Sequence, residues 1–203
     1  MGFFSEIRNN ALIKELECEL NTDVLLFGVD GFIYFGNLQG IDDCRIALLS
    51  PAINADSSDV EILTPGGELH LVNFLRVDLW SIVAKGTGIV SDPIETNDNL
   101  VAVVPPTPSA AVQQRSDLDG IDGRQESHHL IRQLCRMIGD DVVITTLGGF
   151  LFEGTLGDVR NELAIMTVED IFGPGTSSSI SDDDVRSVVI NLEAITSVSG
   201  ATS

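Results

Sequence analysis

The sequence predicts a mostly β protein with short helices, built from two similar domains. Residues 23–38 read DVLLFGVDGFIYFGNL, and residues 141–156 repeat this pattern as DVVITTLGGFLFEGTL without a gap. Each copy follows a segment with helical spacing of apolar residues and precedes several short β-rich runs. Self-similarity of this kind indicates a duplicated unit, and 203 residues are enough for two small domains.

The first domain is expected to consist of a helix followed by five strands. The Asp30-Gly31 pair supplies positive backbone angles for a tight hairpin turn, and Gly36 predicts a sharp bend in the returning strand. Residues 50–67 are expected to form an extended loop or an inserted hairpin. The expected helix covers residues 9–20, capped by Asn9 or Asn10, and the expected strands cover residues 23–27, 32–35 with its continuation, 45–49, 68–77 and 79–84.

A linker separates the two copies. Three prolines in VVPPTPSAAVQQ favour an extended segment, so we predict a first domain over residues 1–86, a Pro-rich acidic linker over 87–125 and a second domain over 126–203. The linker sequence SDLDGIDGR suggests an acidic calcium loop as one alternative. Its spacing is not that of an EF-hand, so a solvated linker is the favoured interpretation.

The second domain is expected to repeat the order of the first. A flexible loop, FGPGTSSSISDDD, stands where the first domain has its longer insertion. The expected elements are a helix starting at Ser127 and ending near Ile138, and strands over residues 142–146, 150–159, 163–168, 185–191 and 194–198.

Charge and cysteine usage restrict the partners and the cellular compartment that the sequence predicts. The formal net charge is -20, from 31 acidic and 11 basic residues. Such a chain repels phosphate, so RNA is disfavoured as a partner, and DNA and membranes are not expected. No apolar run approaches the length of a bilayer span, and the N-terminus does not resemble a signal peptide. Three cysteines without a CxxC motif suit core packing in a reducing cytosol, which predicts a cytoplasmic protein.

No motif for catalysis, a cofactor or a metal is recognisable in the sequence. Cys44 has charged neighbours that could lower its thiol pKa, but a buried thiol at the start of a strand is the favoured interpretation. His128 and His129 point to different helix faces and lack further ligands at metal spacing. His70 is expected to face solvent from a strand. We therefore expect no enzyme, no cofactor and no metal site.

Aromatic residues gather on the bent strand of each copy. Alternation sends Phe32 and Tyr34 to one face of the first copy, as it does the corresponding pair of phenylalanines in the second copy. Phe35 takes the opposite face. Core filling is the favoured interpretation for all of these rings except Phe35, which is a candidate subunit contact because the second copy has Glu153 there.

This order of elements is similar to that of the Sm-like family. A helix, a strand, a glycine turn, a long bent strand of the form Gly-Phe-x-Phe-x-Gly-x-Leu, a third strand, a variable loop and two short closing strands occur twice, over residues 9–85 and 126–199, with Tyr34 in place of the second Phe in the first copy. The resemblance implies two tandem, strongly bent five-stranded barrels, each preceded by an N-terminal α-helix. It also implies pairing of outer strands between subunits, which forms rings.

The RNA site of the Sm-like family is altered in the second copy. The family has an Asp and an Asn four residues apart around its third strand. Here Asp158 and Asn161 are three apart, and Glu162 occupies the place of the amide.

The first copy departs further from the family's RNA site. It has Asp42, Asp43 and Arg45 with no Asn. Where the family has an Arg-Gly pair at the end of the fourth strand, Asp78 and Asn191 stand in the two copies, each followed by a leucine. These departures and the negative charge argue against RNA binding through the family's usual pocket.

The sequence therefore predicts a non-catalytic, oligomeric assembly or scaffolding protein made of two Sm-like domains. We expect rings, or a dimer of tandem units, held together by strand edges. The alternative is an Sm-like RNA-binding protein with an atypical site formed by the candidate residues above.

Overall fold

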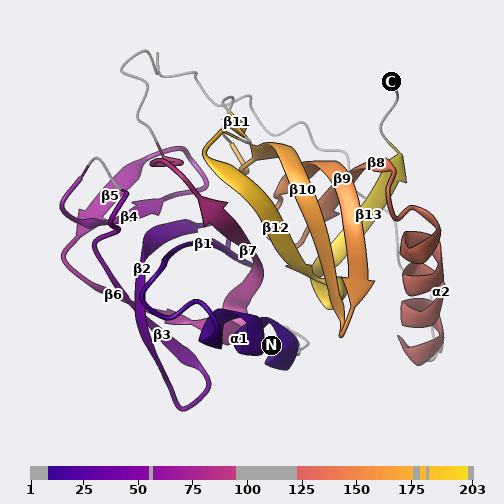
Figure 1. Ribbon diagram of the computed structural model, residues 1–203, viewed down its shortest axis with the longest axis horizontal. Coiled ribbons are helices and arrows are strands. Elements are labelled where there is room, and N and C mark those ends of the chain that lie inside the picture. Colours follow the sequence, from indigo (N-terminus) through magenta and orange to yellow (C-terminus); the bar gives the residue numbers. More distant parts are fainter. Residues whose placement is uncertain (1–8, 55–56, 95–122, 176–178, 182, 201–203) are drawn as a thin grey trace, which may run out of the picture.

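The computed structural model describes residues 9–54, 57–94, 123–175, 179–181 and 183–200. Most of the predicted linker, with Pro105, Pro106, Pro108 and the acidic run, lies outside the described residues. In the described part the protein is mostly β, with two α-helices and one antiparallel sheet of 13 strands. Figure 1 shows the first half of the chain on the left and the second half on the right, joined along the strands between them.

In the described part, the first half contains seven strands where five were expected. The insertion supplies one strand, Val60–Leu63, which forms a hairpin with Leu69–Val72, and the expected strand over 68–77 breaks into two before Leu75. The last strand starts after a 3-10 turn and runs to Ile89, beyond the predicted end, because it has a partner on each side. The elements are α1 Asn10–Glu17, β1 Asp23–Gly28, β2 Ile33–Asp42, β3 Ile46–Ser50, β4 Val60–Leu63, β5 Leu69–Val72, β6 Leu75–Asp78, η1 Leu79–Ser81 and β7 Ile82–Ile89.

The second half follows the same order, with six strands in the described part instead of seven. Its helix begins at Gly123, four residues before the predicted start at Ser127. A short strand forms inside the segment expected to be a loop, and it pairs with β10. The elements are α2 Gly123–Arg136, β8 Asp141–Thr146, β9 Leu151–Arg160, β10 Leu163–Phe172, β11 Ser179–Ser181, β12 Val185–Asn191, η2 Leu192–Ala194 and β13 Ile195–Gly200.

The predicted hairpin repeats in the same register in both halves. Val24 pairs with Gly36 between β1 and β2, and Val142 pairs with Gly154 between β8 and β9. A Cβ atom on Gly36 would lie 2.8 Å from the carbonyl oxygen of Ser50, and one on Gly154 would lie 2.1 Å from a carbonyl oxygen of β10. The strand can bend here because glycine allows the neighbouring backbone to approach closely.

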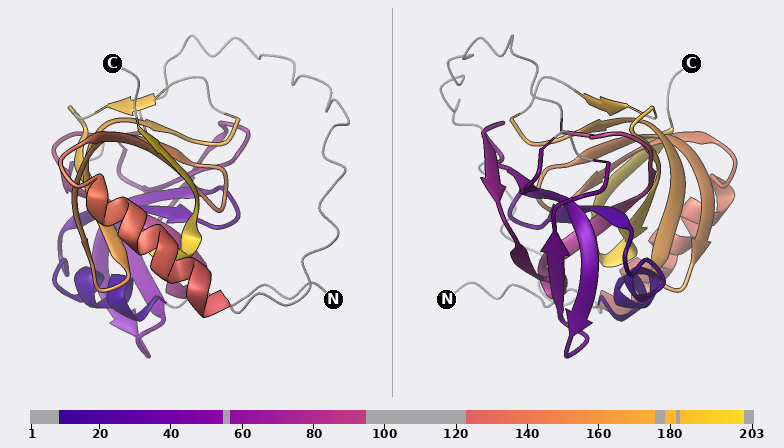
Figure 2. Two further views of the ribbon diagram at one scale, coloured as in Figure 1. Left: turned by 90° about the vertical axis from the view of Figure 1, so that its right-hand side faces the viewer. Right: turned by 60° about the vertical axis from the view of Figure 1, so that its left-hand side comes forward.

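The two halves join by pairing β7 with β12. Lys85 pairs with Val189 and Ala84 with Ile190 in an antiparallel ladder. The strand order is β13-β8-β9-β10-β12-β7-β1-β2-β3-β6, so β13 and β6 stand at its two ends. The views in Figure 2 show the sheet curving around both halves, with α2 at one side and α1 below the junction.

The junction also gives the two halves a shared core. Ile190, Ala84 and Phe27 are neighbours across three adjacent strands and lie on the same face of the sheet. The ring of Phe27 meets Phe150 at 5.2 Å and Phe152 at 5.1 Å between centroids, both edge to face. The outer face of β1 therefore closes the core of the second half.

Phe35 lies on the same outer face as Phe27 and is fully buried in this shared core. It was predicted as a candidate subunit contact, and in the structure it packs between the two repeats of a single chain. In the second half, the corresponding position on β9 is Glu153, which is half-buried. The two copies have thus diverged on one face of the same strands.

The helices occupy unequal environments. The three apolar residues of α1 are buried in a second core cluster, which also contains Leu163 and Val189 of the second half: they are Leu12, Ile13 and Leu16. In α2, only Leu134 of the corresponding three is buried, and Leu130 and Ile131 are half-buried. Helix α1 therefore covers the junction, whereas α2 packs against β9 of the second half.

Candidate functional site

In the first half, the predicted site residues gather at the turn between β2 and β3. Asp43 has a φ of 52°, and the turn is closed by the amide of Arg45, which donates to the carbonyl oxygen of Asp42 at 2.9 Å. The Arg45 guanidinium forms a two-pronged contact with Asp78, at 2.7 Å from Nη2 and 3.2 Å from Nε. Asp78 also accepts from the amide of Trp80 at 3.1 Å.

These contacts favour the ionised form of Asp78. The hydrogen bonds from Arg45 are the largest cause that lowers its pKa below the ordinary value, and the Trp80 amide acts in the same direction. The guanidinium carbon also lies 5.7 Å from the centre of the Trp80 ring. The cation that a phosphate would require is thus already held by a carboxylate and an indole ring.

In the second half, the turn between β9 and β10 has two residues with positive φ, Asn161 at 51° and Glu162 at 64°. This is the geometry of a tight hairpin turn. The Glu162 carbonyl oxygen accepts from the amide of Leu192 at 3.0 Å, which places the turn beside Asn191. Asp158 lies farther along β9, where it accepts from the amide of Val159 at 2.8 Å. The structure therefore brings Asn161, Glu162 and Asn191 close together, but not Asp158.

Asn191 belongs to the junction rather than to an open edge. Its side-chain amide donates to the Asn9 side-chain oxygen, and its own oxygen accepts from the Glu193 amide at 2.9 Å. Asn9 in turn donates to the carbonyl oxygens of Leu79 at 2.5 Å and Ile82 at 2.8 Å. Both asparagines are buried. Asn9 was predicted as a possible helix cap, and it does precede α1, but its side chain makes no capping hydrogen bond.

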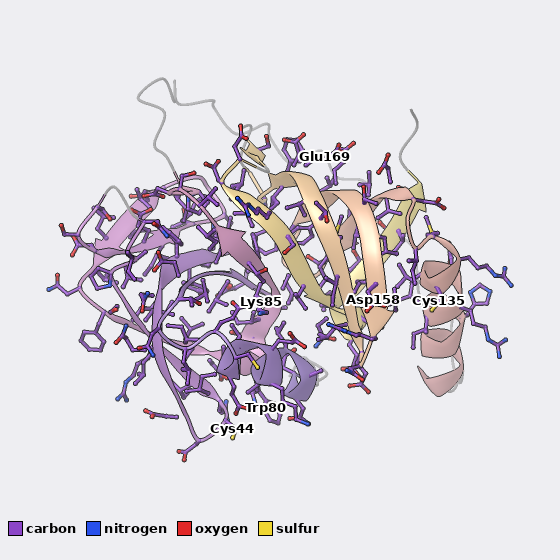
Figure 3. All side chains as sticks on the ribbon, in the orientation of Figure 1. Cys44, Trp80, Lys85, Cys135, Asp158 and Glu169 are labelled. Atoms are coloured by element: carbon purple, nitrogen blue, oxygen red, sulfur yellow. The ribbon has the colours of Figure 1, made fainter. Side chains whose placement is uncertain are left out.

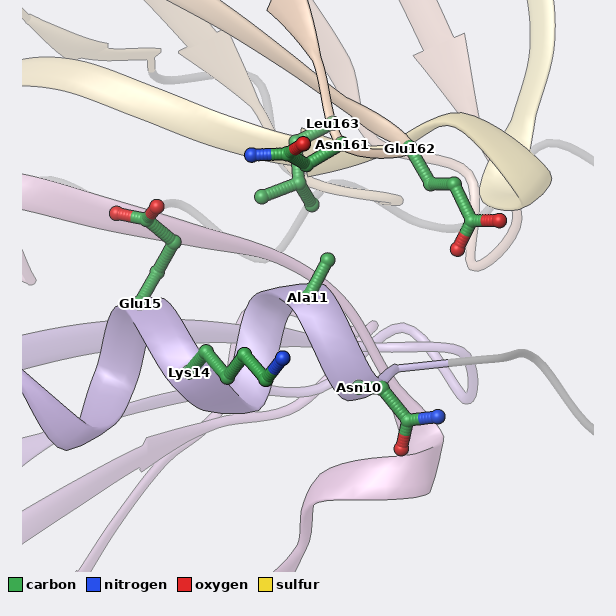
Figure 4. A pocket seen from close by; sticks show the side chains of 7 residues that line it. All are labelled: Asn10, Ala11, Lys14, Glu15, Asn161, Glu162 and Leu163. Atoms are coloured by element: carbon green, nitrogen blue, oxygen red, sulfur yellow. The ribbon is translucent and has the colours of Figure 1, made fainter.

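A cavity of about 480 Å³ opens between α1 and the β9–β10 turn (Figure 4). It contains two of the predicted site residues, Asn161 and Glu162, and several residues of α1 that the sequence did not single out. Lys14 and Glu15 lie on α1 at one side of the cavity, and Asn161 and Glu162 lie at the β9–β10 turn on the other side. The lining residues are Asn10, Ala11, Lys14, Glu15, Asn161, Glu162 and Leu163. The cavity offers mixed charges and amides to a polar ligand.

A second cavity, of about 470 Å³, lies beside the start of β1. Its central carboxylate, Asp23, accepts hydrogen bonds from the amides of Ile53 and Asn54, at 2.9 Å each, and from the side chain of Asn37 at 2.9 Å. These bonds hold the inserted loop against the sheet, so Asp23 has a structural role in this cavity.

Phe32 and Tyr34, the aromatic pair of the first copy, were predicted to fill the core, but both are only half-buried. Phe32 and Tyr34 stack with ring centres 6.2 Å apart and planes 9° from parallel. The Tyr34 hydroxyl donates to Asp30 at 3.4 Å. Burial first, and then the charge of Asp30, raise the pKa of Tyr34 to about 12.

The cysteine predictions were wrong. All three thiols are exposed, and Cys44 stands in the β2–β3 turn with a φ of 53° rather than at the buried start of a strand. Figure 3 shows Cys44 near Trp80 at the bottom of the view and Cys135 on α2 at the right. His70 faces solvent as predicted. Among the residues that the structure describes, no three His, Cys, Asp or Glu side chains could together hold a metal ion.

Neither helix, over the part of the chain that the structure describes, combines the length and apolarity needed to cross a bilayer.

Comparison with known proteins does not assign the chain to a family. No family model matches the sequence, and no curated protein matches it. Function is therefore inferred from the strand edges, the junction and the cavities.

Proposed function

We propose that this chain is a non-catalytic assembly or scaffolding module, built from two Sm-like repeats, that oligomerises through the edges of its sheet. The single observation that carries this proposal is the pairing of β7 with β12. One copy of the repeat binds the other by adding strand to strand, in a ladder from Val185 and Ile89 to Ile190 and Ala84.

The end strands of the sheet support the same proposal. Within the described residues, β6 pairs with β3 alone and β13 pairs with β8 alone. Each therefore has one side without a ladder partner in that part of the chain. Because an unpaired strand edge is a template for another strand, these ends favour association. The repeat in the chain already uses this mode of contact at its centre.

The composition of the candidate site agrees with a role that is not catalytic. Arg45 is engaged by Asp78, and Asn191 by Asn9 and by the Glu193 amide. These groups act as structural ties near the strand ends. An assembly module needs such ties, because they hold the edges in a fixed shape before association.

Multi-angle light scattering and sedimentation velocity, from low micromolar to submillimolar concentration, test this proposal. We expect a mass of two or more chains that is reached reversibly with concentration. A monomer throughout this range would overturn the proposal. Salt is a useful second variable, because contacts that bury apolar surface persist at high salt whereas non-specific charge effects are screened.

RNA binding is the second candidate, and the cavity between α1 and the β9–β10 turn favours it. Lys14, Asn10 and Asn161 offer a cation and amides to a nucleotide. Fluorescence anisotropy with uridine-rich and adenine-rich oligomers at physiological salt tests it. If the chain is an assembly module, we expect it to bind neither oligomer. RNA binding that is lost in the Lys14→Ala variant would favour the RNA function instead.

A further inference from the structure

We infer that the partner of β6 is β6 of a second copy of this chain, joined antiparallel about a two-fold axis. This inference rests on the proposed assembly function and names its contact. It differs from a repetition of the β7–β12 contact, which would join β6 to β13 of the next copy and continue head to tail. A two-fold contact uses the same surface on both copies and closes at a dimer.

The side chains on the outer face of β6 form a distinctive row. Phe74, directly before β6, is 69% exposed, Arg76 is exposed, Asp78 is half-buried, and Trp80, in the 3-10 turn η1 directly after β6, is 38% exposed. The register against β3 defines the corresponding positions on the covered strand β12, because Ile46 pairs with Asp78 as Leu163 pairs with Asn191. Those positions hold Ser187, Val189, Asn191 and Glu193. The uncovered strand thus carries aromatic rings at both ends where the covered strand carries small or polar groups.

The backbone of β6 is oriented for pairing. The amide of Leu79 donates to the carbonyl oxygen of Arg45 at 2.8 Å, which marks this pair as a hydrogen-bonded position of the β3–β6 ladder. Because such positions alternate along antiparallel strands, the peptide groups of Arg76 and Asp78 face away from β3. The Asp78 carbonyl accepts from the Ser81 hydroxyl at 2.6 Å and keeps a second lone pair.

One register makes this edge complementary to itself. If Val77 lies opposite Val77 of the second copy, Arg76 lies opposite Asp78, and Asp78 lies opposite Arg76. The same register brings Phe74 of each copy toward the η1 turn that carries Trp80 of the other. The outward peptide groups of Arg76 and Asp78 then face each other as a hydrogen-bonded pair. Shifting the partner by two residues would instead set Arg76 against Arg76 or Asp78 against Asp78, and like charges directly opposite are destabilising.

The other end of the sheet does not offer the surface that a head-to-tail contact needs. At the junction inside the chain, Ala84 and Phe27 present an apolar face to the second half. On β13 and β8 the corresponding positions are Ser197 and Thr145, which pair with each other in the same register. Glu153 lies on that face as well. A polar face of this kind is suited to water, so β6 is left with its own copy as the better match.

Charge reversal gives a sharp test. Arg76→Asp alone places two acids opposite two acids, and Asp78→Arg alone places two cations opposite two cations. Each variant should dimerise roughly tenfold or more weakly than the natural chain, because two attractive pairs become repulsive. Mixed together, the two variants should form a heterodimer, since one chain then presents acids at both positions and the other presents cations at both. Native mass spectrometry of differently tagged chains measures this.

Two further variants keep the test decisive. Phe74→Ser installs a small polar residue of the kind that the covered strand carries, and it should weaken the dimer without disturbing the core. Ser199→Asp on β13, an exposed position, should leave the dimer unchanged. Circular dichroism checks each fold, and if Asp78→Arg fails to fold, the Arg76→Asp and Phe74→Ser results decide.

The outcomes separate this inference from the function on which it rests. Heterodimer rescue, or loss of the dimer with Arg76→Asp and Phe74→Ser alone, supports β6–β6 pairing. An oligomer that survives these changes and breaks with Ser199→Asp overturns the inference but leaves assembly intact. A natural chain that is monomeric at submillimolar concentration overturns both.

Discussion

Lys85 on β7 donates to Glu19 at a distance of 2.5 Å, although only 1% of the lysine side chain is exposed. The lysine stem lies between Leu26 of β1 and Val189 of β12, which belong to the core cluster that α1 covers. The corresponding position of β13, at the end of the sheet, is Val198, which is half-buried. The pair thus marks the junction between the halves.

Removing Glu19 should cost more stability than removing Lys85. Glu19→Ala leaves a buried ammonium without its partner, which costs about 3 kcal/mol in comparable sites. Lys85→Met replaces the charge by an apolar chain of similar length, and because the Glu19 side chain is 23% exposed its carboxylate stays in contact with water; the free energy of unfolding should therefore change by about 1 kcal/mol or less. Urea denaturation measures both, with exposed Glu17→Ala as the control. Equal costs for the two changes would contradict the role assigned to the pair.

Asn9 and Asn191 should be energetically coupled. Asn9→Ala removes donors to the carbonyl oxygens of Leu79 and Ile82 and leaves them buried, at a cost of about 2 kcal/mol. In a double-mutant cycle with Asn191→Ala, we expect a coupling above about 0.5 kcal/mol. Asn10→Ala, at an exposed neighbouring position, provides the control. Additive costs within error would show that the two side chains act independently.

Phe27 should contribute strongly to stability although it belongs to the outer face of its own repeat. Phe27→Ala opens a cavity beside Phe150 and Phe152 and should destabilise the protein by about 3 to 5 kcal/mol. Thr145→Ala at the matching position of the second half should cost much less. Thermal and urea unfolding compare the two variants. A small loss for Phe27→Ala would mean that the halves do not share a core in solution.

Tyr34 allows a direct measurement of pH dependence, because it is the only tyrosine in the chain. Ultraviolet titration of the folded protein should give a midpoint at a pH of about 12, whereas the denatured chain should titrate at a pH of about 10. The folded pKa is raised, so the associated stability is complete below the unfolded value and is lost as pH rises through the folded value. Asp30→Asn should move the midpoint down. A folded midpoint close to that of the denatured chain would contradict the observed burial.

The hairpins could be predicted because their signals are local. Gly36 and Gly154 stand where a neighbouring backbone approaches too closely for any side chain, and both recur at the same place in the repeated pattern. The strand over 68–77 was predicted without its break, since its alternation continues through Phe74. Cys44 was misplaced by a shift of one residue: β3 begins at Ile46, so the thiol falls in the turn.

The junction could not be predicted from local pattern, because it pairs strands that are far apart in the chain. One signal was available. In β1, Leu25 and Phe27 are apolar as well as Val24 and Leu26, and a strand that is apolar on both faces indicates burial on both faces. The candidate site was located in part. Its turns were identified, but the contribution of Lys14 and its neighbours on α1 depends on how that helix crosses to the second half.

Phe27 and Phe35 face the shared core, and Thr145 and Glu153 hold the same places on the second copy. The order of the copies along the polypeptide is therefore not arbitrary. A rearranged gene that encoded the second copy first would bring a carboxylate toward the neighbouring core and leave two phenylalanine rings in water. The two halves therefore have different outer faces, and the second half expressed alone would lack the β1 residues that close its core.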